Sequence, residues 1–210
     1  QHVDISCMKQ LPVIFFDRYD VVQIASDLLG KLVITEIGGE MTGGRIVETE
    51  AYIGITDKAS HSFGGRRTPK NEHMYSAAAT SYIYICYGMH QMLNIVTNKK
   101  GIPDAILIRA IQPEIGIDVM ERRTGKEPGD HTITKGPGNV GKALGLTKIN
   151  SGISLIKGEI RIYKDDESEV RLASIGISKR IGVESAGADG LLPYRFYIKG
   201  NKFVSGRPVK

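Results

Sequence analysis

The segment 47–52 places acidic and aromatic side chains at alternating positions. Successive side chains of an extended strand point to opposite faces, so we expect Glu48, Glu50 and Tyr52 to share one face. Two neighbouring carboxylates suit general acid–base catalysis or the binding of a divalent metal ion. Solvent-exposed acids on an edge strand would give the same pattern, because acidic residues are seldom fully buried. Other residues must decide between these interpretations.

A single arginine, Arg109, interrupts the apolar run 105–111, which is typical of a central strand. A guanidinium buried there without a partner would be very costly, and Glu50 or Glu48 is the natural counter-charge. We expect the arginine to lower the pKa of that carboxylate and keep it ionised, so that it can position and deprotonate a water. A purely structural ion pair is the alternative.

Three tyrosines crowd the segment 82–90, which turns at Gly88. Alternation sends Tyr87 to the face opposite the other two, and some of these rings could belong to the core. Tyr87 and Met89 lie at an expected hairpin tip, where large apolar side chains gain nothing unless they meet a partner. Wedges inserted between base steps are how proteins kink and open duplex DNA.

Two segments carry cations beside glycines. The loop 61–71 combines His61 with Arg66, Arg67 and Lys70, a set suited to phosphate contact and base stacking, or simply a solvated basic loop. The segment 136–144 begins a helix whose backbone N–H groups, beside Lys135 and Lys142, could bind phosphate. No set of ligands at metal-binding spacing accompanies the histidine.

The composition bounds the class of protein. The 210 residues include 28 Lys and Arg against 23 Asp and Glu, a formal net charge of +5 and a pI near 9.1, which favours an anionic partner such as nucleic acid. Cys7 and Cys86 are too few for a disulfide framework, so we expect a reducing interior compartment, the cytoplasm. No apolar run is long enough to cross a bilayer, and no membrane association is expected.

The elements that must position these residues follow from periodicity and turn residues. Helices are predicted over 19–30, 114–124 and 139–144, and strands over 31–37, 44–52, 81–87, 93–98, 105–111, 154–163, 169–177 and 194–198. We expect 53–70 to be a functional loop and 1–12 a flexible segment. Without a linker or repeat, the order predicts a single mixed α+β domain, 1–210, around a curved, largely antiparallel sheet with flanking helices and a protruding hairpin.

Several of these motifs together resemble the alkyladenine (3-methyladenine) DNA glycosylase family, in its bacterial form. The resemblance runs from about residue 15 to 208. Its most specific parts are RIVETEAY at 45–52, HSFGGRRTPKN at 61–71, YIYICYGMH at 82–90, LNIV at 93–96, LIRA at 107–110, KGPGNVGKAL at 135–144, RIGV at 180–183 and PYRFYIKG at 193–200. His90 stands where mammalian members carry a tyrosine.

The resemblance implies a catalytic role for Glu50, as the general base that activates a water held by Arg109 and the backbone carbonyl of Ile181. It further implies that Tyr52 and His61 sandwich a flipped purine. The remaining roles that it implies are packing on the purine edge by Tyr84, exclusion of the 2-amino group of guanine by Asn94, filling of the vacated duplex position by Tyr87, and DNA contact by Met89 and His90.

The implied function is excision of alkylated or deaminated purines from double-stranded DNA during base excision repair. The resemblance implies a monomer that needs neither metal nor cofactor, and the absence of a well-placed lysine indicates no lyase activity. Two other interpretations are a nuclease with Mg²⁺ at Glu48 and Glu50, and a binding module with a tyrosine stacking platform. Loss of activity in EDTA would indicate the nuclease. A Glu50→Gln change that leaves all function intact would indicate the binding module.

Overall fold

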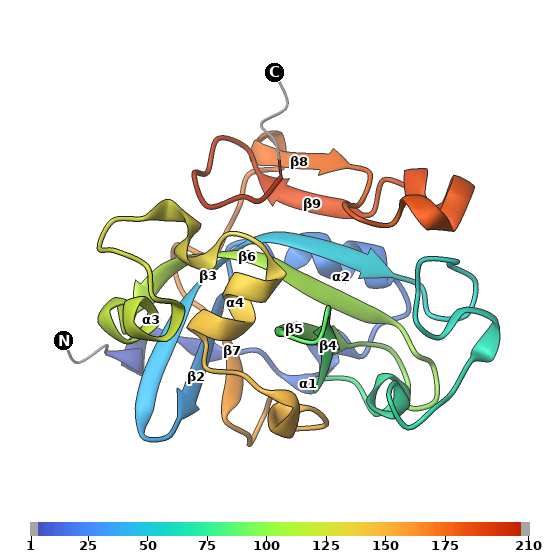
Figure 1. Cartoon of the computed structure of the whole chain (residues 1–210), viewed down its shortest axis with the longest axis horizontal. Helices are drawn as coiled ribbons and strands as arrows, with labels where there is room; N and C mark the ends of the chain where they lie inside the picture. The colour runs from blue at the N-terminus through green and yellow to red at the C-terminus, as the bar shows by residue number, and fades with distance from the viewer. Residues whose placement is uncertain (1–3, 207–210) are drawn as a thin grey trace.

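The computed structural model describes residues 4–206, and its strands form one curved sheet in which every pairing is antiparallel (Figure 1). The strands are β1 (Lys9–Gln10), β2 (Leu32–Ile37), β3 (Glu40–Tyr52), β4 (Thr80–Cys86), β5 (His90–Val96), β6 (Ala105–Ile115), β7 (Ile160–Lys164), β8 (Ile175–Ser178) and β9 (Arg195–Ile198). The order is β1-β7-β2-β3-β6-β5-β4, and β9 joins β3 and carries β8. The predicted α+β class and antiparallel sheet are confirmed.

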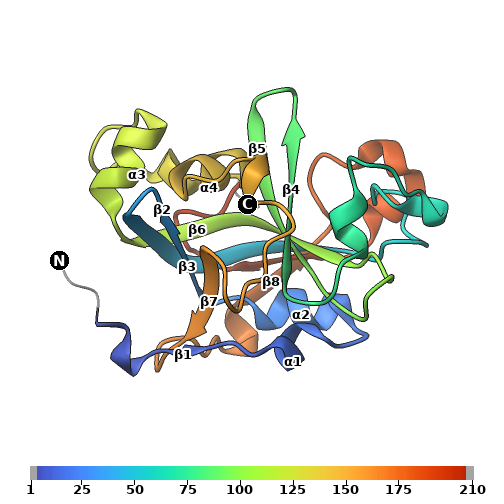
Figure 2. The same ribbon diagram turned by 90° about the horizontal axis from the view of Figure 1, so that it is seen from below.

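The helices cover both sides of the central strands. They are α1 (Val13–Phe16), α2 (Val21–Asp27), α3 (Ile117–Thr124) and α4 (Pro137–Ala143). Figure 2 shows α2 on one side of β3 and β6, and α4 on the other. The Thr49 hydroxyl of β3 donates to the Ala25 carbonyl of α2 at 2.7 Å, which fixes that helix on the sheet.

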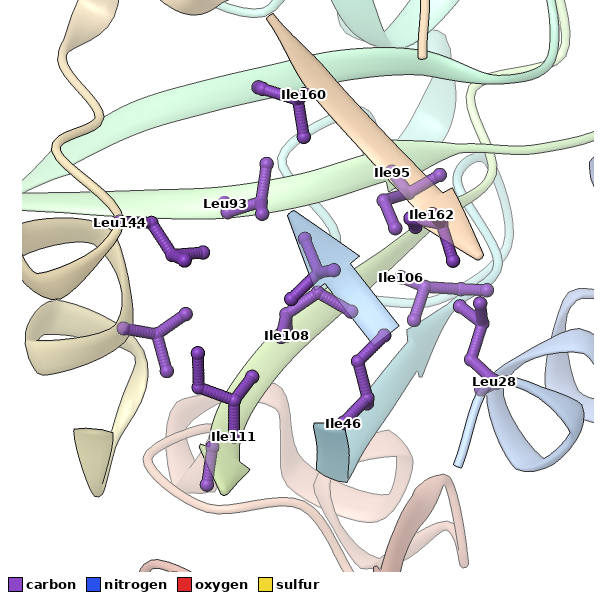
Figure 3. Close-up of a cluster of buried hydrophobic side chains, with 14 of the residues drawn as sticks. Leu28, Ile46, Leu93, Ile95, Ile106, Ile108, Ile111, Leu144, Ile160 and Ile162 are labelled. Carbon is purple, nitrogen blue, oxygen red and sulfur yellow. The ribbon is translucent and has the colours of Figure 1, made fainter. Parts of the chain in front are cut away.

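The core lies where β-branched and leucine side chains of the sheet meet these helices. Figure 3 shows the cluster, to which β3, β5, β6, β7 and both α2 and α4 contribute. Its labelled members, all nearly inaccessible to solvent, are Leu28, Ile46, Leu93, Ile95, Ile106, Ile108, Ile111, Leu144, Ile160 and Ile162. This rigid base supports the polar residues that follow on the same strands.

The pairing of β3 with β6 is irregular around Glu48. The register runs from Ile46 opposite Ile111 to Glu48 opposite Ala110, and then to Thr49 opposite Ile108. One residue on each strand is therefore left out of the ladder, Val47 on β3 and Arg109 on β6. Bulges of this kind redirect side chains and are frequent beside active sites.

Strands β4 and β5 form the predicted protruding hairpin (Figure 2). Only Asn94–Val96 of β5 pair with β6, so the distal part of the hairpin leaves the sheet. At the tip, the Met89 N–H donates to the Cys86 carbonyl at 3.2 Å, while Tyr87 and Gly88 both have positive φ, 51° and 70°. A bulky aromatic residue seldom adopts this conformation, which favours glycine or asparagine.

Several predicted boundaries are wrong. The third helix begins at Ile117 and not at 114, because β6 continues to Ile115 and Gly116 then takes a left-handed φ of 64°. The strand predicted over 154–163 is only β7, since a turn follows Ser154, and that over 169–177 is only β8, since a 3₁₀ helix occupies Leu172–Ser174. The apolar periodicity of a short segment does not reveal turns that depend on tertiary contacts.

The N-terminal segment contains more regular structure than the sequence indicated. The segment expected to be flexible, 1–12, contains β1, whose Lys9 and Gln10 pair with β7, and α1 follows it without having been predicted. The first helix predicted over 19–30 is α2, which Asp20 caps by accepting from the Gln23 N–H at 3.0 Å. Residues 1–3, and the end of the resemblance at 207–208, lie outside the described residues.

Candidate active site

Glu50 lies two residues before the end of β3 and is fully buried. Its Oε1 accepts a hydrogen bond of 2.8 Å from the Tyr52 hydroxyl, and its Oε2 accepts one of 2.7 Å from the backbone N–H of Ile181. The Nη1 of Arg109 is 3.6 Å from Oε1. Glu50 and Tyr52 therefore meet on one side of the strand, as the alternation predicts, and Arg109 lies near both of the carboxylates expected as its counter-charge.

The pKa of Glu50 is raised above its ordinary value, because burial penalises the charged carboxylate more than its neighbours stabilise it. Arg109, the Ile181 amide and the Tyr52 hydroxyl all act in the opposite direction. Arg109 does lower this pKa, as expected, but burial outweighs the arginine, so the net shift is upward. A raised pKa brings a carboxylate nearer to neutral pH, where a general base is most effective.

Both oxygens of Glu48 are also engaged, but its partners include two arginines. Its Oε2 accepts from Arg195 Nε at 2.6 Å and lies 3.4 Å from Arg109 Nε, and its Oε1 accepts from the Ser205 N–H at 2.9 Å. Glu48 is therefore a buried counter-ion for two arginines. Arg195, the first residue of β9, was missed from the sequence.

A cavity of about 400 Å³ opens beside this cluster. It is bordered by six residues singled out from the sequence for catalysis or base binding, which are Tyr52, His61, Tyr84, Asn94, Arg109 and Ile181. Its volume is within the range of pockets that enclose small organic ligands. Lys58 and Ser60 also border the cavity, and sequence reasoning assigned neither to it.

Aromatic rings form one wall of the cavity. The His61 Nδ1 lies 3.0 Å from the Tyr82 hydroxyl, and the His61 ring meets Tyr84 edge to face with centroids 4.4 Å apart. Burial and the charge of Arg66 lower the pKa of His61, so that its ring is neutral at neutral pH. Burial raises the pKa of Tyr84 to about 12, and its hydroxyl stays protonated.

Asn94 lies on β5, opposite Tyr82 of β4 and Leu107 of β6. The residue is buried, and its Nδ2 donates to the Met92 carbonyl at 3.3 Å, which fixes the orientation of the amide. The asparagine borders the cavity from the sheet side. Its expected action against guanine stays a prediction.

Ile181 is held in place by its neighbour Arg180, whose side chain is inaccessible to solvent. The Arg180 guanidinium pairs with the Asp57 carboxylate, donates to the carbonyls of Ala51 and Asp189 at 3.0 and 2.8 Å, and lies 4.7 Å from the Tyr52 ring centroid. It is the Ile181 amide that contacts Glu50, and the expected role of its carbonyl stays a prediction. Arg180 and Asp57 were not recognised from the sequence.

The hairpin tip stands in solvent beside the cavity. Tyr87 is 92% exposed and Met89 70%, and His90 is exposed as well. The His90 ring lies against Gly138 of α4. A side chain at that glycine would collide with the ring, since a Cβ would lie 2.6 Å from the His90 Nδ1. A Cβ on Gly141 would approach the Gln91 carbonyl to 1.8 Å, so these two glycines serve the packing of α4 on β5.

The candidate phosphate-binding cations are in unequal situations. Arg66 and Lys70 are exposed and border a groove of about 610 Å³ along β4, which Lys148 also borders. Arg67 instead pairs with Glu72 at 2.5 Å. Lys142 of α4 is exposed, whereas Lys135 is half-buried.

Within residues 4–206, no three His, Cys, Asp or Glu side chains gather as a metal site would require, and no helix has the length and apolarity to span a membrane.

Comparison with known proteins identifies the family of this chain. The sequence model of a family described as methylpurine-DNA glycosylase matches residues 14–202. Proteins named "Putative 3-methyladenine DNA glycosylase" are 40% identical in Desulfitobacterium hafniense (94% of this chain, 99% of the relative), 41% in Clostridium perfringens strain 13 (91% and 96%) and 42% in Chlamydia felis (91% and 97%). The chain belongs to the methylpurine-DNA glycosylase family and is a DNA glycosylase of base excision repair.

Proposed function

We propose that this enzyme flips alkylated or deaminated purines out of duplex DNA into the cavity and hydrolyses their N-glycosidic bond with a water activated by Glu50. The observation that carries the proposal is a buried carboxylate whose three partners, Tyr52, Arg109 and Ile181, all border a cavity of about 400 Å³. The substrate class comprises 3-methyladenine, 7-methylguanine, hypoxanthine and ethenoadenine.

In the proposed reaction, the bond between C1′ and the purine nitrogen breaks and its electron pair leaves with the base. The sugar acquires oxocarbenium character, which the negative charge of Glu50 stabilises. The water oxygen bonds to C1′ and its proton passes to Glu50. 3-Methyladenine and 7-methylguanine are cationic in DNA and leave as neutral bases, whereas the neutral hypoxanthine and ethenoadenine must first be protonated.

Base binding in this proposal uses the aromatic wall. Tyr52 and His61 stack on the two faces of the purine, Tyr84 packs on its edge and Asn94 excludes the 2-amino group of guanine. The lowered pKa of His61 supports this role, because a neutral imidazole does not repel a cationic base. Electron-rich rings attract such a base through cation–π interaction.

DNA opening is assigned to the hairpin tip and the surrounding cations. Tyr87 would occupy the position that the purine vacates, flanked by Met89 and His90, and its full exposure at a strained turn supports this assignment. The phosphate contacts would come from five cations, which are Arg66, Arg67, Lys70, Lys135 and Lys142. Of these, Arg67 is paired with Glu72 and Lys135 is half-buried.

The decisive experiment replaces the carboxylate by an amide of the same shape. Glu50→Gln should abolish base release, by at least about a hundredfold, while lesion-DNA binding survives. Excision is measured on oligonucleotides that each carry one lesion, followed by alkali cleavage at abasic sites. A mutant that excises every lesion at the wild-type rate removes Glu50 from the mechanism. If the wild-type protein itself excises no lesion and Glu50→Gln binds DNA as well as the wild type, the binding module is favoured.

A further inference from the structure

We propose that Ser205 is a positioning residue for base excision, which holds the Arg109 guanidinium in the orientation that faces Glu50. The proposal rests on the function proposed above and adds the C-terminal segment to that site. Ser205 lies outside all the motifs that were singled out from the sequence.

Every polar group of Ser205 contacts the buried charge cluster. Its N–H donates to Glu48 Oε1 at 2.9 Å, its carbonyl accepts from Arg195 Nη2 at 2.9 Å, and its Oγ accepts from Arg109 Nη2 at 3.2 Å. The residue itself is 7% exposed. The two backbone bonds fix the chain at this point, so the hydroxyl is presented to Arg109 from a rigid support.

Arg109 has no tighter polar contact among the described residues. Its Nε is 3.4 Å from Glu48 Oε2 and its Nη1 is 3.6 Å from Glu50 Oε1, both longer than the bond to Ser205. A long side chain with weak contacts retains rotamer freedom, which a single well-placed acceptor restricts. With Nη2 held by Ser205, Nη1 is the nitrogen that approaches Glu50, and the residue borders the cavity.

The same segment supports a second neighbour of Glu50. A Cβ on Gly206 would lie 3.0 Å from Ile181 Cδ1, so the chain after Ser205 passes directly against the loop whose amide binds Glu50. Arg109 and Ile181, two of the three groups that contact Glu50, therefore both lie against residues 205–206. Tyr52 is supported separately, by Arg180.

The test is Ser205→Ala, which removes the bond to Arg109 and leaves both backbone bonds in place. The single-turnover excision rate at saturating enzyme should fall about ten- to hundredfold, the value of one hydrogen bond to a charged group, with lesion-DNA binding changed less than about twofold.

The pH profile provides a second readout. The charged and titratable groups that face Glu50 are Arg109, Tyr52, Glu48, Tyr84 and Arg180. A loosened Arg109 stabilises the carboxylate less, so the acid limb of excision should move to higher pH.

Ser178→Ala is the matched control, because the Ser178 hydroxyl accepts from Arg195 Nη1 at 3.0 Å and does not contact Arg109. This variant should excise at the wild-type rate. If Ser205→Ala does not fold, the near-isosteric Ser205→Cys is measured in its place. An unchanged rate and acid limb, or equal losses in the two serine variants, would overturn the proposal. Loss of activity in Glu50→Gln together with a wild-type Ser205→Ala would refute this inference alone, whereas an active Glu50→Gln would refute the proposed function.

Discussion

The Tyr52 hydroxyl donates a hydrogen bond of 2.8 Å to Oε1 of Glu50, so the residue proposed to stack on the base also contacts the proposed catalytic carboxylate. This bond stabilises the charged form of Glu50 and partly offsets the effect of burial on its pKa. Tyr52→Phe keeps the ring and removes the bond. The pKa of Glu50 should then rise further.

The measurement is the pH dependence of single-turnover excision of 7-methylguanine. Excision needs the ionised carboxylate, so the rate falls as pH decreases through the raised pKa of Glu50. In Tyr52→Phe this acid limb should move up by about one pH unit, since a hydrogen bond to a charged group contributes about 1.5 to 3 kcal/mol and one unit corresponds to about 1.4 kcal/mol. Tyr82→Phe is the control, because its hydroxyl contacts His61 and not Glu50. Identical acid limbs in the two variants would contradict the assignment.

The exposed tip residue Tyr87 should matter for DNA binding more than for chemistry. Its ring replaces stacking worth about 1 to 3 kcal/mol, so Tyr87→Ser should weaken lesion-duplex binding by about five- to 150-fold. The maximal single-turnover rate should change less, because this side chain touches neither water nor sugar. Binding is measured at one fixed salt concentration, since phosphate contacts make affinity depend on salt.

Thermal unfolding provides the control for this change. Tyr87 is 92% exposed with a φ of 51°, so Tyr87→Asn should raise the melting temperature slightly while losing the same binding. Unchanged affinity in a stable protein would move the wedge to Met89 or His90.

The enzyme should hydrolyse without forming a covalent intermediate. Borohydride should trap no adduct with lesion DNA, and excision should persist in EDTA. Lys58 is the lysine that borders the cavity, so Lys58→Ala is compared with the wild type in the trapping experiment. An adduct that disappears in Lys58→Ala would identify a lyase nucleophile. A strict requirement for Mg²⁺ would instead support a nuclease.

The buried pair of Arg180 and Asp57 should contribute strongly to stability. Arg180→Met leaves Asp57 buried without its counter-charge, which should lower the free energy of unfolding by about 3 to 5 kcal/mol. Arg67→Ala, which breaks the exposed pair with Glu72, should change it little. Chemical denaturation with equal m-values compares the two variants. Equal stabilities would show that Arg180 does not anchor the loop before Ile181.

Much of the local structure could be read from the sequence. Alternation along β3 placed Glu50 and Tyr52 on one face, and the apolar run around Arg109 indicated a central strand with a buried ion pair. These predictions succeed because backbone geometry alone sets which side chains of a strand share a face. Six residues that the sequence singled out for catalysis or base binding also border the cavity.

Only the tertiary structure decided how the two carboxylates differ. Glu48 accepts hydrogen bonds from Arg195 and from the Ser205 amide, which lie 147 and 157 residues further along the chain, whereas the residues that contact Glu50 border the cavity. The direction of the Glu50 pKa shift likewise depends on burial by distant segments, which outweighs the neighbouring charge of Arg109. Burial and long-range ion pairs are properties of how the elements pack, and a periodic pattern in one strand carries no information about them.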